Sequence, residues 1–552
     1  MSQLPNPVQQ LLKRAAETPN EPYLHQPVNG VWRSYTWGEV AEQARRMASA
    51  LIAMGLKPGD AVGITGMNNA HWFMADFACG LAGLIGVGLY PKQSEDAVRF
   101  IAGHAGIKAA FIGPMPDAAG FLGALPAEVV RIALPYPGVA ECAQNWDQLI
   151  AANKPLATPV ERGADEVWSL IYTSGTTGNP KGVIITAANL AFTVAGVLRD
   201  QPPVASGEHF LSYLPLAHAF ERGAVETASL YLPAQVHFLE ELEKLPQTLA
   251  MVRPTRFYGV PLVYSRVQGG ILKKLPQAKI DRLLSIPIVS GFIRRKIRKG
   301  LGLDRAWLVI SGAAPLPRPI IEWFAKLGID VLQGYGMTEN SIYASLNLPG
   351  QNKVGSIGKP YVDAGLRIAE DGEIQCKHPG NTPGYYKDPE KTAELFTADG
   401  WLRTGDKGHI DSDGYLFITG RVKEIFKTLK GKYVSPAPIE GKFGTNTAVE
   451  QMCLVGTGLY QPMLVLSLNA DARKLPREQI EAGLVATMKS VNATLEPHEE
   501  ICKIVVTKDA WTIDNSLMTP TMKVRRNEIE KRYLELLGKL EADRKTKVYW
   551  ED

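Results

Sequence analysis

One loop constrains the fold of this chain more than any other segment. Residues 172–183 read YTSGTTGNPKGV and follow the apolar run at residues 167–172. The run predicts a buried strand. The loop offers backbone N–H groups, hydroxyls and one lysine, which suit polyphosphate oxygens because glycine lets the backbone approach closely. The alternative is a flexible surface turn. A Walker A loop is excluded, since Asn179 and Pro180 separate Gly178 from Lys181.

The rest of the chain predicts an α/β protein of two unequal domains. With 552 residues, two or more domains are expected. Strand-like and helix-like segments alternate up to about residue 420, which favours parallel sheets with ligands beyond the carboxyl ends of the strands. Residues 61–66 and 306–310 read as buried strands, and a helix follows a capping Asn68 or Asn69. After residue 420 the segments shorten, with a strand at 463–468 and a last amphipathic helix.

Composition narrows the class of protein. A net charge of +4, with 45% hydrophobic and 21% charged residues, is typical of a globular protein and gives no argument for nucleic-acid binding. The five cysteines lie far apart and predict free thiols in a reducing, cytoplasmic setting. The longest apolar window, residues 72–90, contains Asp76 and four glycines, so a helix running into a strand is expected there.

One segment departs from the overall charge balance. Between residues 273 and 298, Lys and Arg flank an apolar patch at 283–293. One interpretation is a solvated helix pair with a buried seam. The other is peripheral contact with an anionic membrane.

Five further segments follow the loop in a fixed order: 311–316 (SGAAPL), 333–339 (QGYGMTE), 401–406 (WLRTGD), 420–424 (GRVKE) and 520–526 (PTMKVRR). With the loop, they resemble the AMP-binding, adenylate-forming superfamily of acyl-CoA synthetases, peptide-synthetase adenylation domains and luciferases, over nearly the whole chain. The resemblance implies a domain of layered α/β subdomains at 1–420, with two mostly parallel sheets and a small β-barrel-like part. It also implies a small, mobile α+β domain at 421–552, with a hinge at 421–424.

The resemblance also implies an ATP site. Thr173, Ser174, Gly175, Thr176, Thr177, Gly178 and Lys181 would hold the β- and γ-phosphates, Glu339 would bind Mg²⁺, and Thr338 would reach the α-phosphate. Tyr335 would lie against one face of adenine, and Gly312 and Ala313 would approach the other face. Segments 311–316 and 333–339 would also contribute Ala314, Gln333, Gly334, Gly336 and Met337 to nucleotide binding. Asp406 would accept the ribose hydroxyls, Arg421 would lie near them, Lys523 would be the catalytic cation and Lys423 the hinge residue.

Each of these residues also has a purely structural interpretation. The carboxylates and Thr338 could serve turns and helix starts, and Tyr335 could be a core residue. Arg421 could form a surface salt bridge, and Lys523 could be one more charge in the run with Arg525 and Arg526.

The acid is indicated by residues 214–222 (LPLAHAFER), which resemble the long-chain fatty-acid branch. His218 and Phe220 would line the acyl side; a capped helix with one buried histidine is the alternative. Residues 427–436 also resemble that branch but are one residue longer than the short-acid pattern, so no CoA contact is assigned to Lys430 or Gly431.

The sequence therefore predicts a ligase that uses ATP, Mg²⁺ and CoA to convert a long-chain fatty acid to acyl-CoA through acyl-AMP. The alternatives are acyl transfer to a carrier protein, an adenylating ligase for another acid, a non-catalytic lipid-binding relative, and an adaptor acting through 273–298. Assembly as a homodimer is left open.

Overall fold

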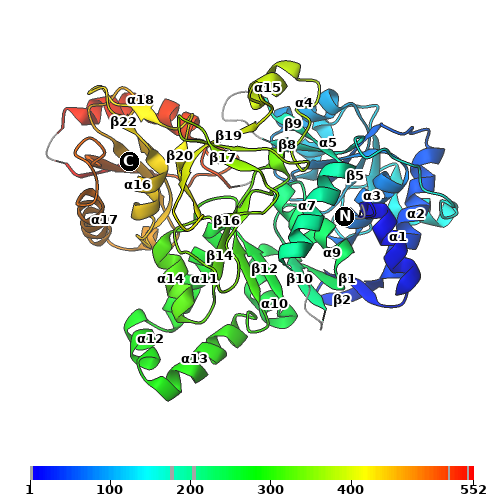
Figure 1. The fold of residues 1–552 in the computed structure, drawn as a ribbon, viewed down its shortest axis with the longest axis horizontal. Coiled ribbons are helices and arrows are strands. Elements are labelled where there is room, and N and C mark those ends of the chain that lie inside the picture. The colour runs from blue at the N-terminus through cyan, green and yellow to red at the C-terminus, as the bar shows by residue number, and fades with distance from the viewer. Residues whose placement is uncertain (1–3, 174–178, 202–206, 520–521, 544–545, 552) are drawn as a thin grey trace.

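The computed structural model describes residues 4–173, 179–201, 207–519, 522–543 and 546–551. Figure 1 shows a large body built from the N-terminal and central parts of the chain and a smaller lobe from its C-terminal part. The predicted loop residues Ser174, Gly175, Thr176, Thr177 and Gly178 lie outside the described residues.

A seven-stranded sheet forms the core of the first part. Its order is β7 (Gln144–Asn145), β6 (Val130–Ala133), β5 (Ile107–Ile112), β3 (Ala61–Thr65), β4 (Ile85–Leu89), β8 (Val167–Thr173) and β9 (Lys181–Thr186). All neighbours run parallel except β8 and β9. The connecting helices are α2 (Trp37–Ala53), α3 (Ala70–Leu81), α4 (Glu95–Ala105), α5 (Ala118–Ala124) and α6 (Trp146–Ala152). Asn69 caps α3 by accepting the Trp72 N–H, as predicted.

A second sheet carries the central part of the chain. Its order is β12 (Arg256–Gly259), β13 (Leu308–Ser311), β14 (Val331–Tyr335), β15 (Ser345–Leu346) and β16 (Lys359–Pro360), with the first three strands parallel. Around it lie α10 (Leu245–Val252), α11 (Pro261–Lys274) and α14 (Arg318–Lys326), whereas α12 (Gln277–Leu284) and α13 (Pro287–Gly300) project away from the body. A smaller mixed sheet joins β10 (Glu208–Ser212), β11 (Ala234–Phe238), β1 (Pro22–Val28) and β2 (Val31–Thr36).

The last strands before residue 421 form an antiparallel sheet of β17 (Leu366–Ile368), β18 (Glu373–Cys376), β19 (Leu402–Ile410) and β20 (Leu416–Arg421). We compare this sheet with the predicted barrel-like part. The described strands leave this sheet open, so it is not a closed barrel. A turn at Val422–Glu424 follows β20 and leads to the short pair β21 (Phe426–Lys427) and β22 (Tyr433–Val434).

The smaller lobe has its own sheet and its own core. Its strands are β23 (Val449–Val455), β24 (Met463–Leu468), β25 (Lys503–Val506) and β26 (Val548–Trp550), packed with α16 (Pro436–Phe443), α17 (Arg477–Asn492) and α18 (Arg526–Glu541). Among the described residues, no apolar core cluster contains members from both sides of residue 421. The contacts across include two exposed ion pairs, Arg266–Glu450 and Lys273–Asp471. Exposed ion pairs of this kind contribute little to the free energy that holds two lobes together.

Candidate active site

The stem of the predicted phosphate loop is a strand pair. Thr173 at the end of β8 lies opposite Lys181 at the start of β9. The Lys181 ammonium lies 4.9 Å from the ring centroid of Tyr385. The Tyr385 hydroxyl in turn donates to Glu339 Oε1 at 2.8 Å. Tyr385, which sequence reasoning missed, therefore connects the loop lysine to the predicted metal-binding carboxylate.

Glu339 and Thr338 lie together in the short 3₁₀ helix Thr338–Asn340, and both are buried. The Met337 N–H donates to the side chain of Asn340, which fixes the start of this turn. A single carboxylate fits magnesium chemistry, because Mg²⁺ is usually held by one or two carboxylates together with substrate phosphates. Within the residues described, no cluster of three or more His, Cys, Asp or Glu side chains could hold a metal alone.

Two turns at the carboxyl ends of β13 and β14 form the predicted adenine side. The first contains Gly312, Ala313 and Ala314, and Ala313 has φ +66°, in the left-handed region. At the second, a Cβ on Gly336 would lie 2.3 Å from the carbonyl carbon of Ile342, so only glycine fits. Gly334 precedes Tyr335 on β14.

The Gln333 side chain is already engaged: it accepts the Leu316 N–H at 2.9 Å and donates to the Ser356 carbonyl at 3.2 Å. The Gln333 side chain therefore links the turn after β13 to the loop that precedes β16.

Asp406 is the centre of a polar network. Its Oδ2 accepts the Tyr335 hydroxyl at 2.7 Å, and its Oδ1 accepts Arg421 Nε at 2.8 Å. Arg421 stands opposite Asp406 on the neighbouring strand, and this carboxylate raises the pKa of Arg421. Each carboxylate oxygen can accept two hydrogen bonds, so Asp406 keeps acceptor capacity for two further hydroxyls.

Lys523 reaches this network from the smaller lobe. It follows Met522, whose φ is +60°, and its N–H donates to Thr519 Oγ1 at 3.1 Å. The pKa of Lys523 is lowered, first by loss of water around the ammonium and then by the Arg421 charge. The carboxylates of Asp406 and Glu339 act in the opposite direction. Lys523 is therefore within electrostatic range of Arg421, Asp406 and Glu339, and the residue as a whole is exposed.

His218 is a second titratable group whose pKa depends on the charge of Lys523. Burial, and then the charge of Lys523, lowers the pKa of His218 to about 3. Its Nδ1 accepts the Phe220 N–H at 3.1 Å. The ring is therefore neutral at pH 7 and carries its proton on Nε2.

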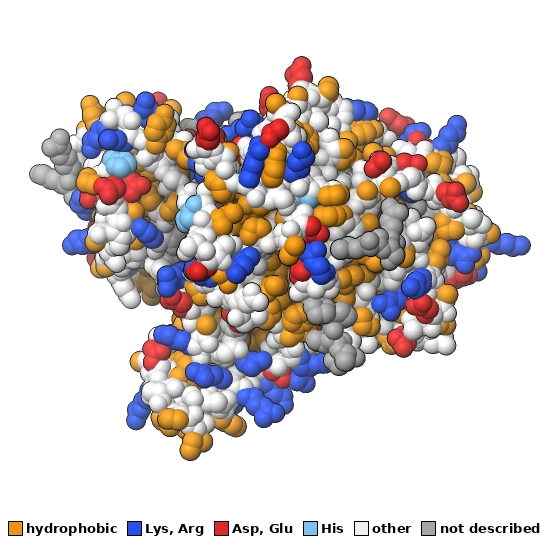
Figure 2. Space-filling model, in the orientation of Figure 1, with side chains coloured by type: hydrophobic (Ala, Val, Ile, Leu, Met, Phe, Trp, Pro, Cys, Tyr) orange, Lys and Arg blue, Asp and Glu red, His pale blue; other side chains and the backbone are white. Residues whose placement is uncertain are grey.

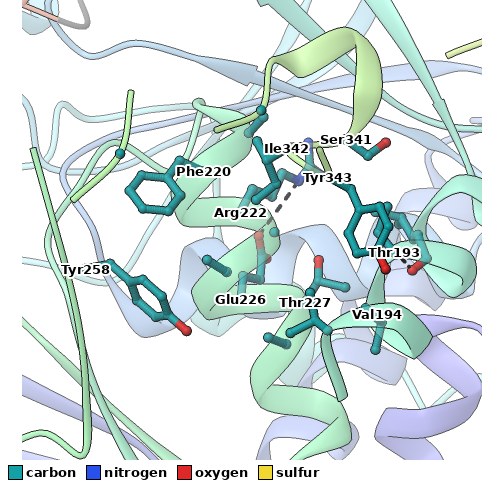
Figure 3. Close-up of a pocket in the computed structure, with 18 of the residues that line it drawn as sticks. Thr193, Val194, Phe220, Arg222, Glu226, Thr227, Tyr258, Ser341, Ile342 and Tyr343 are labelled. Carbon is teal, nitrogen blue, oxygen red and sulfur yellow. Dashed lines mark hydrogen bonds and ion pairs between the residues drawn. The ribbon is translucent and has the colours of Figure 1, made fainter. Parts of the chain in front are cut away.

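A largely apolar pocket opens from these residues. Its volume is about 150 Å³, and its lining runs from Gly312, Tyr335 and His218 to Leu230. Figure 3 shows Phe220 and Tyr258 on one side, and Thr193, Val194 and Tyr343 on the other. The two sequence-predicted substrate residues, His218 and Phe220, are thus brought together at one cavity.

The pocket wall also contains a buried charge cluster that sequence reasoning missed. Arg222 is the first residue of the π-helix Arg222–Thr227. Its guanidinium forms an ion pair with Asp76 and donates a hydrogen bond to Ser169 Oγ. Its Nε also lies 3.7 Å from Glu226 Oε2. Burial raises the pKa of Glu226 well above its ordinary value. Arg222 is the last residue of the 214–222 segment, but its partner Asp76 lies on α3, and no sequence spacing connects the two.

Lys423, the predicted hinge residue, lies apart from the cleft contacts. It is exposed in the middle of the turn Val422–Glu424. The Glu424 and Ile425 N–H groups both donate to the Arg421 carbonyl, which closes this turn. The predicted hinge therefore begins directly after the arginine that contacts Asp406.

Comparison with known proteins identifies the class. A family model described as "AMP-binding enzyme" matches residues 11–386, and one described as "AMP-binding enzyme C-terminal domain" matches 424–544. The first match covers more than half of the chain. The chain therefore belongs to the AMP-binding enzyme family.

Relatives that are similar in sequence are named for long-chain fatty-acid substrates. A long-chain-fatty-acid–CoA ligase of Mycobacterium bovis is 29% identical, covering 92% of each chain. Long chain acyl-CoA synthetase 6, peroxisomal, of Arabidopsis thaliana is 30% identical over 92% of this chain and 81% of its own.

Among solved structures, the anthranilate CoA ligase AuaEII in complex with anthranoyl-AMP has a TM-score of 0.80 at 21% identity, covering 98% of this chain and 99% of its own. The A domain of a carboxylic acid reductase from Segniliparus rugosus, in complex with AMP and a co-purified carboxylic acid, has a TM-score of 0.81 at 21% identity, covering 97% and 94%. At this identity the two structures show the fold, an adenylate-forming enzyme with a large and a small domain.

Proposed function

We propose that this protein activates a long-chain fatty acid with ATP and transfers the acyl group to CoA. The observation that carries the proposal is one cavity whose lining joins the Tyr335 turn to a deep apolar pocket. An acid could enter that cavity with its carboxylate toward Lys523 and its chain among apolar side chains. The names of the long-chain relatives support the same substrate class.

In the first step, a carboxylate oxygen attacks the α-phosphorus of ATP, the bond to the β-phosphate oxygen breaks, and pyrophosphate leaves. Both reactants are anions, so the site must supply positive charge where they meet. We assign that task to Lys523, with the Thr338 hydroxyl on the α-phosphate. Thr173, Lys181 and the loop between them would hold the outer phosphates, and Glu339 would hold Mg²⁺ with them.

The nucleoside would lie on the Asp406 network. The two remaining acceptor positions of Asp406 match the two ribose hydroxyls, and the hydrogen bond from Tyr335 holds that ring for stacking on adenine. Arg421 keeps the carboxylate in place. Ala313 and Ala314 border the same turn, and Gly312, Gly334 and Gly336 leave space for close approach.

On the acyl side, neutral His218 presents its Nε2–H as a hydrogen-bond donor. We propose that it orients the substrate carboxylate without adding a second full charge beside Lys523. Phe220 and Tyr258, whose rings meet edge to face at 5.7 Å, would flank the first carbons of the chain.

The second step needs a different surface near the acyl-adenylate. The CoA sulfur attacks the acyl carbon, the thiol proton is released, and AMP leaves. We propose that the lobe of residues 421–552 rotates about Lys423 against residues 1–420 between the steps. The separate apolar cores on the two sides of residue 421 support this division.

A second candidate is an adenylating ligase for another acid or for a carrier-protein acceptor. It is favoured by the similar folds of an anthranilate CoA ligase and of a reductase didomain that carries a PCP domain.

We propose a cytoplasmic location for either enzyme. Among the described helices, none is long and apolar enough to cross a bilayer.

The experiment is acid-dependent AMP formation with acids from acetate to oleate, each with CoA, with a holo-carrier protein, or with neither. We expect AMP and acyl-CoA to form together, with long acids preferred. Preference for an aryl or short acid would replace the substrate class. AMP formation with the carrier protein but not with CoA would replace the acceptor.

A further inference from the structure

We propose that α12 and α13 form a docking surface for an anionic lipid bilayer. The two helices lie between β12 and β13 in the chain and project from the large body at its lower edge in Figure 1. Each helix has a single buried residue, Ile280 in α12 and Ser290 in α13. This surface does not depend on the proposed acyl-CoA ligase activity.

The end of the projection is apolar and exposed. Ile286 is 44% exposed, Ile288 91% and Phe292 67%. Phe292 is four residues after Ile288 in the same helix, so both side chains lie on one face. Figure 2 shows hydrophobic side chains at the end of this projection, with Lys and Arg around it. Exposing large apolar side chains to water costs free energy, so an apolar environment that covers Ile288 and Phe292 would be favourable.

The charges around that apolar end are almost all positive. Residues 273–299 contain nine Lys and Arg and one acidic residue, Asp281. In the described part of the chain, seven of these cations are exposed and form no ion pair: Lys274, Lys279, Arg282, Arg294, Arg295, Lys296 and Lys299. Arg295 and Lys299 continue the helical face of Ile288 and Phe292 at steps of three and four residues. One face of α13 is thus apolar at its start and cationic at its end.

This combination matches a membrane surface better than nucleic acid. Phosphate headgroups would meet the Lys and Arg side chains, while Ile288 and Phe292 would enter the layer below them. A nucleic acid would use the cations but would leave the two apolar side chains in water. The strands that flank the projection also border the pocket, through Tyr258 on β12 and Ile310 on β13. The two strands that connect to the docking surface in the chain therefore also contribute residues to the pocket.

The test is co-sedimentation of the full-length protein with vesicles. One set is pure phosphatidylcholine, and the other contains about 30% phosphatidylglycerol. We expect binding to the anionic vesicles and its loss at about 0.5 M salt, because salt screens exposed charges. No binding of the unaltered protein to anionic vesicles would overturn the proposal.

Two variants test the two halves of the surface. I288S/F292S should weaken binding by about tenfold or more, because two apolar side chains are lost. R295Q/K296Q/K299Q should weaken it by about 100-fold, at about fivefold for each cation near an anionic surface. All five side chains are exposed, so the thermal unfolding midpoint should not change.

Matched controls use exposed residues elsewhere. V31S/L534S removes apolar side chains that are 73% and 60% exposed, and K489Q/K531Q/K539Q removes three cations from α17 and α18. Both controls should bind as the unaltered protein does. Equal losses in the controls, or full binding by I288S/F292S with displacement by short duplex DNA, would contradict the membrane surface.

Discussion

The two ends of the cleft are built from different materials. The nucleotide end is a network of polar contacts at 2.7 to 2.8 Å around Asp406 and Glu339, approached by Lys523 from the other lobe. The acyl end is a wall of apolar side chains with no dominant polar contact, apart from the buried Arg222 cluster. The first can bind by directed charge and the second by excluding water. A single substitution should therefore matter far more at the first end than at the second.

The sharpest way to break this contrast is Lys523→Ala. Loss of one positioned charge at a developing anion typically costs on the order of 10²- to 10³-fold in rate. We expect that loss in acid-dependent pyrophosphate release, whereas transfer of a preformed acyl-adenylate to CoA should be nearly unchanged. Lys523→Arg is the control that keeps the charge. Equal losses in both steps would remove Lys523 from its assigned role.

Asp406→Asn comes next, because it keeps the shape but removes the charge of the network centre. Hydrogen bonds to charged groups contribute about 1.5–3 kcal/mol, so we expect the KM for ATP to rise about 10- to 100-fold with little change in the KM for the acid. Tyr335→Phe removes only the Tyr335–Asp406 bond and should have a smaller effect. If the two variants behave alike, Asp406 serves only to hold Tyr335.

The sequence predicts the residues of the nucleotide end better than those of the acyl end. Thr338, Glu339, Asp406 and Arg421 come from short contiguous motifs, so their order along the chain was enough to group them. The strand at 167–172 and the Asn69 cap were also predictable, because local periodicity and local hydrogen bonds determine them.

The pocket residues could not be predicted in this way. Asp76 and Arg222 are 146 residues apart, and Tyr385 contacts Glu339 across 46 residues. Only the folded sheets bring them together. The last helix shows the limit on a smaller scale. Helical spacing in the sequence predicts an apolar face of Ile529, Tyr533, Leu536 and Leu540. In the structure Leu537 is buried, whereas Leu536 is only partly buried.

Lys423→Pro tests whether the two reaction steps use separate conformations of the lobes. Proline restricts φ at residue 423 and disfavours helical backbone at Val422, so it should hinder rotation of the lobe without touching the cleft. We expect acyl-CoA formation to fall on the order of tenfold while pyrophosphate release changes little. Lys423→Ala should leave both steps intact. Equal losses with proline would rule out the hinge.

At the acyl end, Tyr343→Ala should alter selectivity more than rate. The Tyr343 ring stacks on Tyr361 at 4.1 Å, and its hydroxyl donates to Asp363 at 2.7 Å. Truncation should enlarge the pocket and shift kcat/KM toward longer or bulkier acids. The shift should be about fourfold for each CH₂ newly buried, from about 0.8 kcal/mol apiece. Tyr343→Phe keeps the ring and should keep the profile. An unchanged acid profile in Tyr343→Ala would show that the chain lies elsewhere.

The smallest effect should be a shift in pH dependence. Lys523 acts as a cation, so its rate contribution is present below its pKa and is lost as the pH rises through it. Because loss of water around the ammonium and the charge of Arg421 lower that pKa, kcat/KM for the first step should fall at a pH below the ordinary lysine value. ATP phosphates favour the charged lysine, so the fall in kcat should come at higher pH than the fall in kcat/KM, which reports the free enzyme. Arginine stays protonated, and the alkaline fall should therefore disappear in Lys523→Arg even if its rate is lower. The same alkaline fall in that variant would assign the titration to another group and would weaken the electrostatic account of the nucleotide end.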